Sequence, residues 1–202
     1  MSESIKISDK IVKLAKKQGI IQVRDLRKEG IHPEYLRRLY EKGRLVKVAR
    51  GQYALPELKF SENHSLSLVG KSVPNANICL LSALRFYSIG TQAPYEVWIA
   101  IQNRTAKPQV RYPKLRVFYY SGMAYSEGVE EHLIDSVQVK IYSPAKTIAD
   151  CFKYRNKIGI DVAIEALRDG WQQNKFNMDE LWRFAKICRV TNVMKPYMES
   201  LT

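Results

Sequence analysis

The feature that most constrains this chain is a short stretch in which a basic helical pattern is followed at once by a tight two-stranded pattern. It reads HPEYLRRLYEKGRLVKVARGQYAL and occupies residues 32–55. Pro33 suits the first position of a helix, where its missing N–H costs nothing, and Gly43 ends the helix. The segments RLVKVA and QYAL then predict two strands joined by a turn at Arg50 and Gly51. A helix and a hairpin are therefore expected back to back.

Residue spacing within this stretch predicts which side chains are buried. Apolar residues at i, i+3 and i+4 line one face of a helix, and alternate residues line one face of a strand. The residues expected to pack inward are Leu36, Leu39, Tyr40, Leu45, Val46 and Val48. Arg44 and Lys47, which stand between them, are expected to face solvent.

Two more helical patterns precede this stretch. The first covers residues 8–18, with Ser8 as its expected N-cap and Gly19 as its end. After a short extended segment, VRDLRKEG predicts a second helix that ends at Gly30. Three helices followed by a two-stranded wing are the plan of a winged helix-turn-helix.

The charge of the chain is strongly positive and unevenly distributed. Its formal net charge is +13 and its pI is about 9.6, a balance that usually indicates an anionic partner, most often nucleic acid. Residues 1–60 hold 15 Lys/Arg and 7 Asp/Glu, whereas the remaining 142 residues hold 18 and 13. The positive field is therefore densest over the winged-helix pattern. A basic surface with no specific partner is the alternative.

The charged face of this pattern predicts a DNA-binding surface. A helix fits the major groove, and arginine binds guanine or phosphate in a bidentate manner. The candidate DNA-binding residues are Arg24, Arg27, Lys28, Glu34, Tyr35, Arg37, Arg38, Lys42, Lys47, Arg50 and Gln52. Winged helices also serve as protein-interaction modules, so a protein partner is the alternative for this domain.

The rest of the chain predicts a second domain. The segment PELKFSEN, residues 56–63, reads as a linker, so we expect a winged-helix domain at 1–57 and a second domain at 62–202. The helical patterns SLSLVGKSV and NICLLSALRFYSIG, on either side of Pro74, precede the strand patterns EVWIAIQ, LRVFYYS, EHLID and VQVKIYS. About four helices follow, the first with Ser143 as its N-cap. The predicted fold class is α+β, with a small sheet and C-terminal helices after the winged helix.

The cysteines and the apolar segments argue against a metal site and a membrane span. Cys79, Cys151 and Cys188 are isolated in apolar surroundings and form no CxxC pair, so we interpret them as reduced core residues of a cytoplasmic protein. The first residues lack the apolar core of a signal peptide, and no apolar run is long enough to span a bilayer. We therefore expect no metal, no cofactor and no membrane partner.

The main enzymatic alternative is a metal-dependent nuclease. Asp135 followed by Gln138 and Lys140 is a fragment of the pattern with which restriction-type nucleases hold a metal. The spacing is too short for two separate strands, and the alternation in VQVKIY explains the two polar residues as a solvent-exposed face. Asp150 is expected to form a capping or interhelical hydrogen bond. We therefore expect a protein that is not an enzyme.

Two segments of the chain resemble a known family. YLRRLYEKGRLVKVARGQYAL resembles the N-terminal winged helix of the AbiEi-type antitoxins of type IV toxin–antitoxin, or abortive-infection, systems. The matching elements are Leu-x-x-Leu at 36–39, Lys-Gly-x-Leu at 42–45 and Arg-Gly-x-Tyr at 50–53. Downstream, residues 142–171 resemble the family's C-terminal segment, with a Thr-x-x-Asp-Cys-Phe core at 147–152.

The resemblance implies an antitoxin that represses its own operon by binding inverted repeats in the promoter. It also implies that the C-terminal domain counteracts a co-encoded nucleotidyltransferase-like toxin, and that neutralisation need not involve a stable complex of the two proteins. The family's DNA contacts carry over to Arg37, Arg38, Lys42, Lys47 and Arg50. Some relatives of this architecture are plain transcriptional regulators without a toxin, so that alternative stays open.

Overall fold

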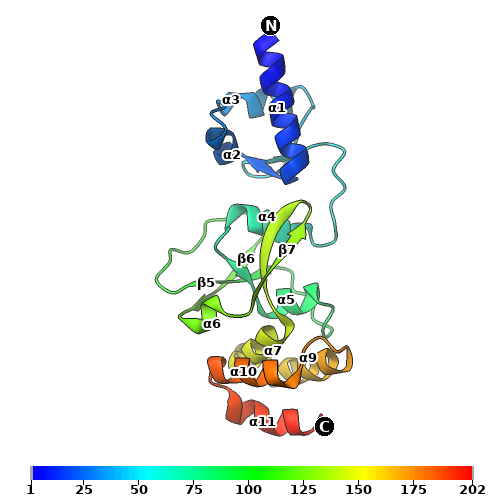
Figure 1. Cartoon of the computed structure of the whole chain (residues 1–202), viewed down its shortest axis with the longest axis vertical. Coiled ribbons are helices and arrows are strands. Elements are labelled where there is room, and N and C mark those ends of the chain that lie inside the picture. Colours follow the sequence, from blue (N-terminus) through cyan, green and yellow to red (C-terminus); the bar gives the residue numbers. More distant parts are fainter. Residues whose placement is uncertain (1, 202) are drawn as a thin grey trace. The chain divides into compact units, whose positions relative to one another are not determined.

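The computed structural model describes residues 2–201, with side chains from residue 6 onward, and these residues form two compact units (Figure 1). Unit 1 contains the chain up to Pro74 together with Val110–Pro113 and Leu133–Val139. Unit 2 contains Asn75–Gln109, Lys114–His132 and the chain from Lys140 onward. The predicted boundary at residues 57–62 stays a prediction.

Unit 1 begins with the three helices and three short strands of a winged helix. Its elements are α1 Ser2–Gln18, β1 Ile21–Gln22, α2 Val23–Lys28, α3 Glu34–Glu41, β2 Val46–Ala49, β3 Gln52–Ala54 and α4 His64–Ser72. The strands form an antiparallel sheet in the order β1-β3-β2. Gly51, with φ +71°, makes the turn of the wing, because glycine adopts this left-handed conformation without steric cost. The winged-helix prediction is confirmed.

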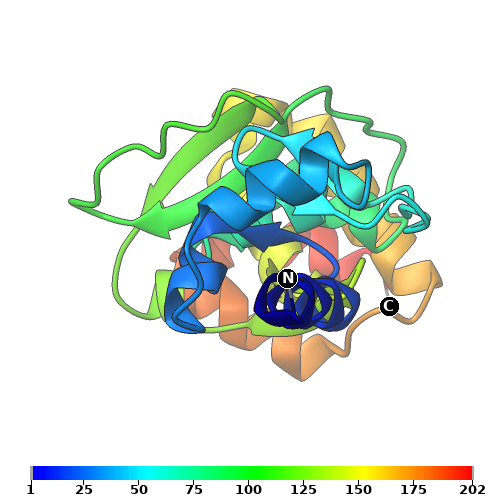
Figure 2. The same cartoon turned by 90° about the horizontal axis from the view of Figure 1, so that it is seen from above.

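The core of the winged helix draws side chains from all three of its helices. Ile11 and Ala15 of α1, Leu26 of α2, and Leu36 and Leu39 of α3 are buried in one cluster. Figure 2 views α1 along its axis, with α2 and α3 around it. Burial of these apolar side chains stabilises the domain, at roughly 25 cal/mol for each Å² removed from water.

Three local predictions about the winged helix are wrong. Ser8 does not begin a helix, because α1 already starts at Ser2. Tyr40 is 47% exposed, and it packs edge-on against Tyr53 of the wing, with ring centroids 6.1 Å apart. Val46 is 36% exposed, because β2 is an edge strand of the small sheet. Helical spacing identified the right face of α3 but extended it one residue too far.

Polar contacts join the winged helix to α4 within unit 1. Lys71 of α4 forms an ion pair with Asp25 of α2 at 2.9 Å, and its Nζ also donates to the side-chain oxygen of Gln18 at 2.9 Å. Burial lowers the pKa of Lys71, and the contact with Asp25 opposes that shift. Side chains of both partners are about one-tenth exposed. The helix after the predicted linker thus packs with the winged helix.

Unit 2 contains most of a five-stranded sheet and the C-terminal helices. The remaining elements of the chain are β4 Asn77–Ile78, α5 Leu80–Phe86, β5 Val97–Gln102, β6 Leu115–Tyr120, α6 Met123–Ser126, β7 Val129–Ile134, β8 Val137–Tyr142, α7 Pro144–Lys153, α8 Arg155–Ile158, α9 Ile160–Gln172, α10 Met178–Cys188 and α11 Thr191–Glu199. The strand order is β6-β5-β4-β8-β7, with β5 parallel to β6 and β4 parallel to β8.

The predicted α+β class is confirmed, with one local correction. Residues 77–78 were expected to belong to a helix, but they form the central strand β4, which pairs with both β5 and β8. A two-residue strand leaves no alternation to read in the sequence. No helix among residues 2–201 is long and apolar enough to span a membrane.

Helix α7 is the centre of unit 2. Ser143 is its N-cap as predicted, since its side chain accepts a hydrogen bond from the backbone N–H of Lys146. Helices α5, α9, α10 and α11 all contact α7, and Figure 1 shows α9 and α10 beside it. Residues 144–152 are consequently buried on every side of the helix, including Lys146 and Asp150.

Candidate nucleic-acid interface

The exposed face of α3 carries alternating charge. Glu34, Arg37, Arg38 and Glu41 recur at helical spacing on the side of α3 opposite Leu36 and Leu39, which are each 2% exposed. A helix with one buried apolar face and one polar face matches the requirement for insertion into the major groove. The fold therefore places the two arginines of α3 in solvent, where the DNA-binding prediction needs them.

Glu34 contacts both arginines of α3. Its carboxylate accepts from Arg37 at 2.7 Å and lies 3.7 Å from the guanidinium of Arg38, while Glu41 lies 3.5 Å from Arg37. The hydrogen bond from Arg37 lowers the pKa of Glu34 below its usual value. Arg38 also lies over the ring of Tyr35, 5.5 Å from its centroid. These contacts orient the two guanidinium groups on the exposed face of α3.

The wing and the loop before it carry cations that no acidic side chain neutralises. Arg50 stands at the turn of the wing beside Gly51, and Lys47 is on β2. Lys42 caps the C-terminus of α3. Among residues 6–201, whose side chains the structure describes, none of these three forms an ion pair, and the same holds for the two exposed cations of α2, Arg27 and Lys28.

Two predicted DNA-binding residues are committed to contacts inside unit 1. The guanidinium of Arg24 donates to the backbone carbonyl of Lys71 in α4. Gln52 was expected on the outer face of the wing, and that prediction is wrong: it is 2% exposed. Its Nε2 donates to the Leu68 carbonyl at 3.2 Å and to the Ser72 hydroxyl at 2.5 Å. Gln52 thus anchors β3 to α4.

Asp135, the residue singled out for a nuclease, lies in the turn between β7 and β8. Its side chain is 3% exposed. One oxygen accepts from the backbone N–H of Ser61 at 2.9 Å, and the other lies 2.9 Å from His64 Nδ1 and 3.0 Å from the Ser67 hydroxyl. Both oxygens therefore already serve hydrogen bonds, which favours a structural role for Asp135. No cluster of potential metal ligands occurs among the residues that the structure describes.

We predict that Asp135→Asn destabilises unit 1. Burial raises the pKa of Asp135, but the hydrogen bonds from Ser61, His64 and Ser67 together bring it below its usual value. A depressed folded-state pKa contributes stability above the unfolded pKa of about 3.9, and that contribution is lost as the pH falls through the folded pKa. We expect the substitution to cost about 1–3 kcal/mol at neutral pH, and less below pH 4.

Hydrogen exchange of the α4 segment, measured in the full chain at pH 7 and at about pH 3, where the contribution of the carboxylate is being lost, checks this prediction. The matched control is Glu131→Gln, which removes a carboxylate from an exposed position in the same hairpin. Faster exchange in α4 at pH 7 for Asp135→Asn, but not for the control, is the expected result. Equal exchange in the two variants would contradict the structural role of Asp135.

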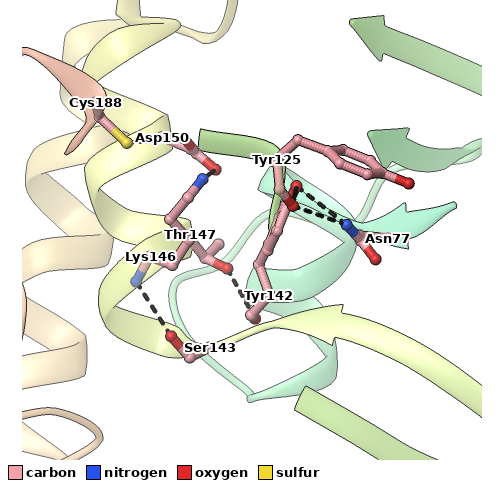
Figure 3. Close-up of polar contacts among 8 residues, drawn as sticks. All are labelled: Asn77, Tyr125, Tyr142, Ser143, Lys146, Thr147, Asp150 and Cys188. Carbon is pink, nitrogen blue, oxygen red and sulfur yellow. Dashed lines mark hydrogen bonds and ion pairs between the residues drawn. The ribbon is translucent and has the colours of Figure 1, made fainter. Parts of the chain in front are cut away.

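A second polar cluster is buried in unit 2, around α7 (Figure 3). Lys146 Nζ donates to Asp150 Oδ2 at 2.5 Å, and neither side chain is exposed. The ammonium lies 4.2 Å from the ring centroid of Tyr142 and 4.9 Å from that of Tyr120. The Sγ–H of Cys188 in α10 donates to the other oxygen of Asp150 at 3.2 Å. The interhelical hydrogen bond predicted for Asp150 is therefore confirmed.

The polar network continues from α7 to the sheet. The Tyr142 hydroxyl donates to the Tyr125 carbonyl at 2.8 Å, and Asn77 Nδ2 donates to the Tyr142 hydroxyl at 3.1 Å. The hydroxyl of Thr147 donates to the Tyr142 carbonyl at 3.1 Å. Figure 3 shows these side chains converging between α7 and the strands. The network ties the sheet to the central helix.

The three cysteines are buried and reduced, as predicted. Burial, followed by the negative charge of Asp150, raises the pKa of the thiols of Cys79, Cys151 and Cys188. A thiol with a raised pKa stays protonated and is a weak nucleophile. The arrangement around Asp150 is thus suited to holding helices together rather than to covalent chemistry.

Lys146 and Lys71 form buried or nearly buried ion pairs that the sequence-based predictions did not include. A signal for Lys146 was present, because a lysine four residues before an aspartate in the apolar helix AKTIADCF places both charges on one buried face. Lys71 offered no such signal, since its partners Asp25 and Gln18 are distant in sequence. Contacts of that kind depend on the tertiary packing.

Comparison with solved structures supports the fold. The crystal structure of the RV2827C protein from Mycobacterium tuberculosis is similar, with a TM-score of 0.58 and 14% sequence identity. The similarity covers 89% of this chain and 71% of that one, and at this identity it concerns the fold alone. No curated protein matches the chain significantly.

Comparison with family models concerns the winged helix. The matched stretch, residues 9–56, contains α2, α3 and the wing. It ends before α4, so the resemblance noted at residues 142–171 stays a prediction. Residues 9–56 match the model of the AbiEi antitoxin family of transcriptional regulators.

Proposed function

We propose that this protein is a transcriptional autoregulator that binds inverted repeats in its own promoter through the winged helix. The observation that carries the proposal is the exposed face of α3, where Arg37 and Arg38 stand opposite the buried Leu36 and Leu39. The unpaired cations of the wing extend this charged face. The family match at residues 9–56 supports the same role.

In the proposed complex, α3 lies in the major groove and the wing contacts the phosphate backbone. Arg37 and Arg38 then exchange Glu34 for base edges or phosphates, since arginine binds guanine O6 and N7 in a bidentate manner. Lys42, Lys47 and Arg50 bind phosphates and position the helix without reading sequence. The interaction needs no cofactor and no bond-breaking step.

We further propose that the protein is an antitoxin that counteracts a co-encoded toxin. The family described as AbiEi antitoxins supports this role, and we assign the function to unit 2, because the winged helix is used for DNA. Expression of the neighbouring gene with and without the full chain tests it. Growth arrest that the full chain does not relieve would contradict the antitoxin role. A neighbouring gene that causes no growth arrest would leave a plain regulator without a toxin.

Binding of the full chain to its own promoter fragment and to a scrambled fragment tests the regulator. We expect affinity for the promoter to be about 10³-fold higher at physiological salt, and both affinities to fall steeply as salt rises. Fluorescence anisotropy titrations at two salt concentrations measure both quantities. Equal affinity for the two fragments would contradict sequence-specific regulation.

A further inference from the structure

The segment between β5 and β6, together with the first two residues of β6, has an unusual composition. Residues 103–116 read NRTAKPQVRYPKLR and contain five Lys/Arg and no Asp/Glu. Residues 61–202 hold 18 Lys/Arg and 13 Asp/Glu, a surplus of 18 − 13 = 5. The five Lys/Arg of this short segment therefore equal the whole excess of Lys/Arg over Asp/Glu in residues 61–202.

The sheet topology explains the length of this segment. β5 and β6 are parallel, with Val97 paired to Leu115 and Gln102 paired to Tyr120. The chain must therefore return along the full length of β5, roughly 20 Å at 3.3 Å per residue, before β6 begins. Residues 103–114 make this return without helix or strand. A crossover of this length requires no particular charge, so the topology leaves the five cations unexplained.

The cations of the crossover are exposed, and most have no partner. All five, Arg104, Lys107, Arg111, Lys114 and Arg116, are exposed. Arg116 lies 3.6 Å from Glu96, and Lys114 lies 5.1 Å from the ring centroid of Tyr95. The side chains of the other three form no ion pair and no cation–π contact with any side chain that the structure describes, residues 6–201. They are thus available to an anionic ligand.

Part of the crossover belongs to the same compact unit as α3. Val110–Pro113 belong to unit 1, together with α2, α3 and the wing. Arg111 and the 64% exposed Tyr112 lie within this stretch. The segment accordingly contributes to the unit that we propose to bind DNA.

We propose that the crossover segment 103–116 is a second DNA-binding element, which contacts the phosphate backbone of duplex DNA independently of sequence. The proposal rests on the proposed function for the identity of the ligand. Lysine and arginine in an irregular segment suit phosphate contacts, which add affinity and position a protein without reading bases. Base recognition stays with α3.

The test uses the full chain with Lys107→Gln and Arg111→Gln, two exposed cations without an ion pair. The matched control is Lys175→Gln with Lys186→Gln, which removes the same charge from two exposed positions of unit 2 outside the crossover. Binding to a labelled promoter duplex and to a scrambled duplex is measured by anisotropy over a range of salt concentrations. Circular dichroism confirms that each variant is folded.

We expect the crossover variant to lose roughly 10- to 30-fold in affinity for both duplexes at about 0.15 M salt, with the specificity ratio retained. The slope of log K against log salt should shrink by about 2, because each phosphate contact contributes about 0.9. The control should change neither quantity by as much. A crossover variant that binds like its control would overturn this inference and leave the winged helix as the DNA-binding element.

The two proposals fail in different ways. If the unaltered chain binds both duplexes equally but the crossover variant binds each more weakly, the result supports the crossover contact and contradicts sequence-specific regulation. If the unaltered chain distinguishes the duplexes but the variant keeps the full slope of log K against log salt, the result supports the regulator and contradicts the crossover contact. Loss of affinity for the promoter alone would also overturn the inference, because it would indicate base recognition by the crossover.

Discussion

Replacing Arg37 and Arg38 together with alanine should abolish preferential binding to the promoter fragment. Each well-placed bidentate contact of arginine with guanine contributes about 1–3 kcal/mol to discrimination between bases, so the pair can account for the whole of a roughly 10³-fold preference. The fold should be unchanged, because the two side chains are 67% and 57% exposed and contribute no apolar burial to the core. Anisotropy titrations on both fragments, with thermal melts of each variant, measure the two effects separately.

Glu34→Gln is the informative counterpart of that double substitution. Glu34 accepts from Arg37 at 2.7 Å and lies 3.7 Å from Arg38, so its charge competes with DNA for both guanidinium groups. Removing the charge should raise affinity for the scrambled fragment several-fold, since a carboxylate also repels phosphate.

For the double arginine substitution, promoter binding that survives Arg37→Ala with Arg38→Ala at full specificity would contradict the insertion of α3 into the major groove.

The parts of the fold that the sequence predicts best are those with local signals. Each helix of the winged helix is followed within two residues by a glycine with positive φ, namely Gly19, Gly30 and Gly43. Spacing also identified the buried Leu36 and Leu39. Such signals need no knowledge of the rest of the chain. They sufficed for the order of elements in unit 1 and for the capped start of α7.

The errors occur where distant segments decide a residue's environment. Gln52 reads as the polar position of an exposed hairpin, but α4 covers it and supplies the acceptors for its amide. The strand β4 is too short to show alternation, and its identity depends on pairing with β5 and β8. The candidate DNA-binding residues on α3 and the wing could be chosen from the sequence, because each lies in or next to an element that a local pattern predicts.

The crossover segment lies between these two cases. Its composition is visible in the sequence, since residues 103–116 contain five cations and no acid. Its meaning depends on the parallel pairing of β5 with β6, which requires a long return segment whatever residues compose it. Only the topology shows that the fold explains the length of this segment and does not explain its positive charge.

The largest effect on stability is expected at the buried ion pair of α7. Asp150→Ala leaves the ammonium of Lys146 without its partner at a site with no solvent exposure, and Lys146→Met leaves the carboxylate in the same condition. Removing one member of a buried ion pair costs about 3–5 kcal/mol. This cost is a large fraction of the total stability of a domain, which is about 5–15 kcal/mol. The thiol of Cys188 would also lose its acceptor in the Asp150 variant.

The double substitution Lys146→Met with Asp150→Leu separates the charge effect from the packing effect. Replacing a buried pair by apolar side chains of similar volume is often neutral or stabilising, so the double variant should recover most of the stability that each single variant loses. Denaturant unfolding followed by tryptophan fluorescence reports on unit 2, because Trp98, Trp171 and Trp182 all lie in it. Single variants within about 1 kcal/mol of the unaltered chain would show that the pair is hydrated. A double variant as unstable as the singles would show that the network through Tyr142 and Cys188, and not the charge pair itself, holds α7 in place.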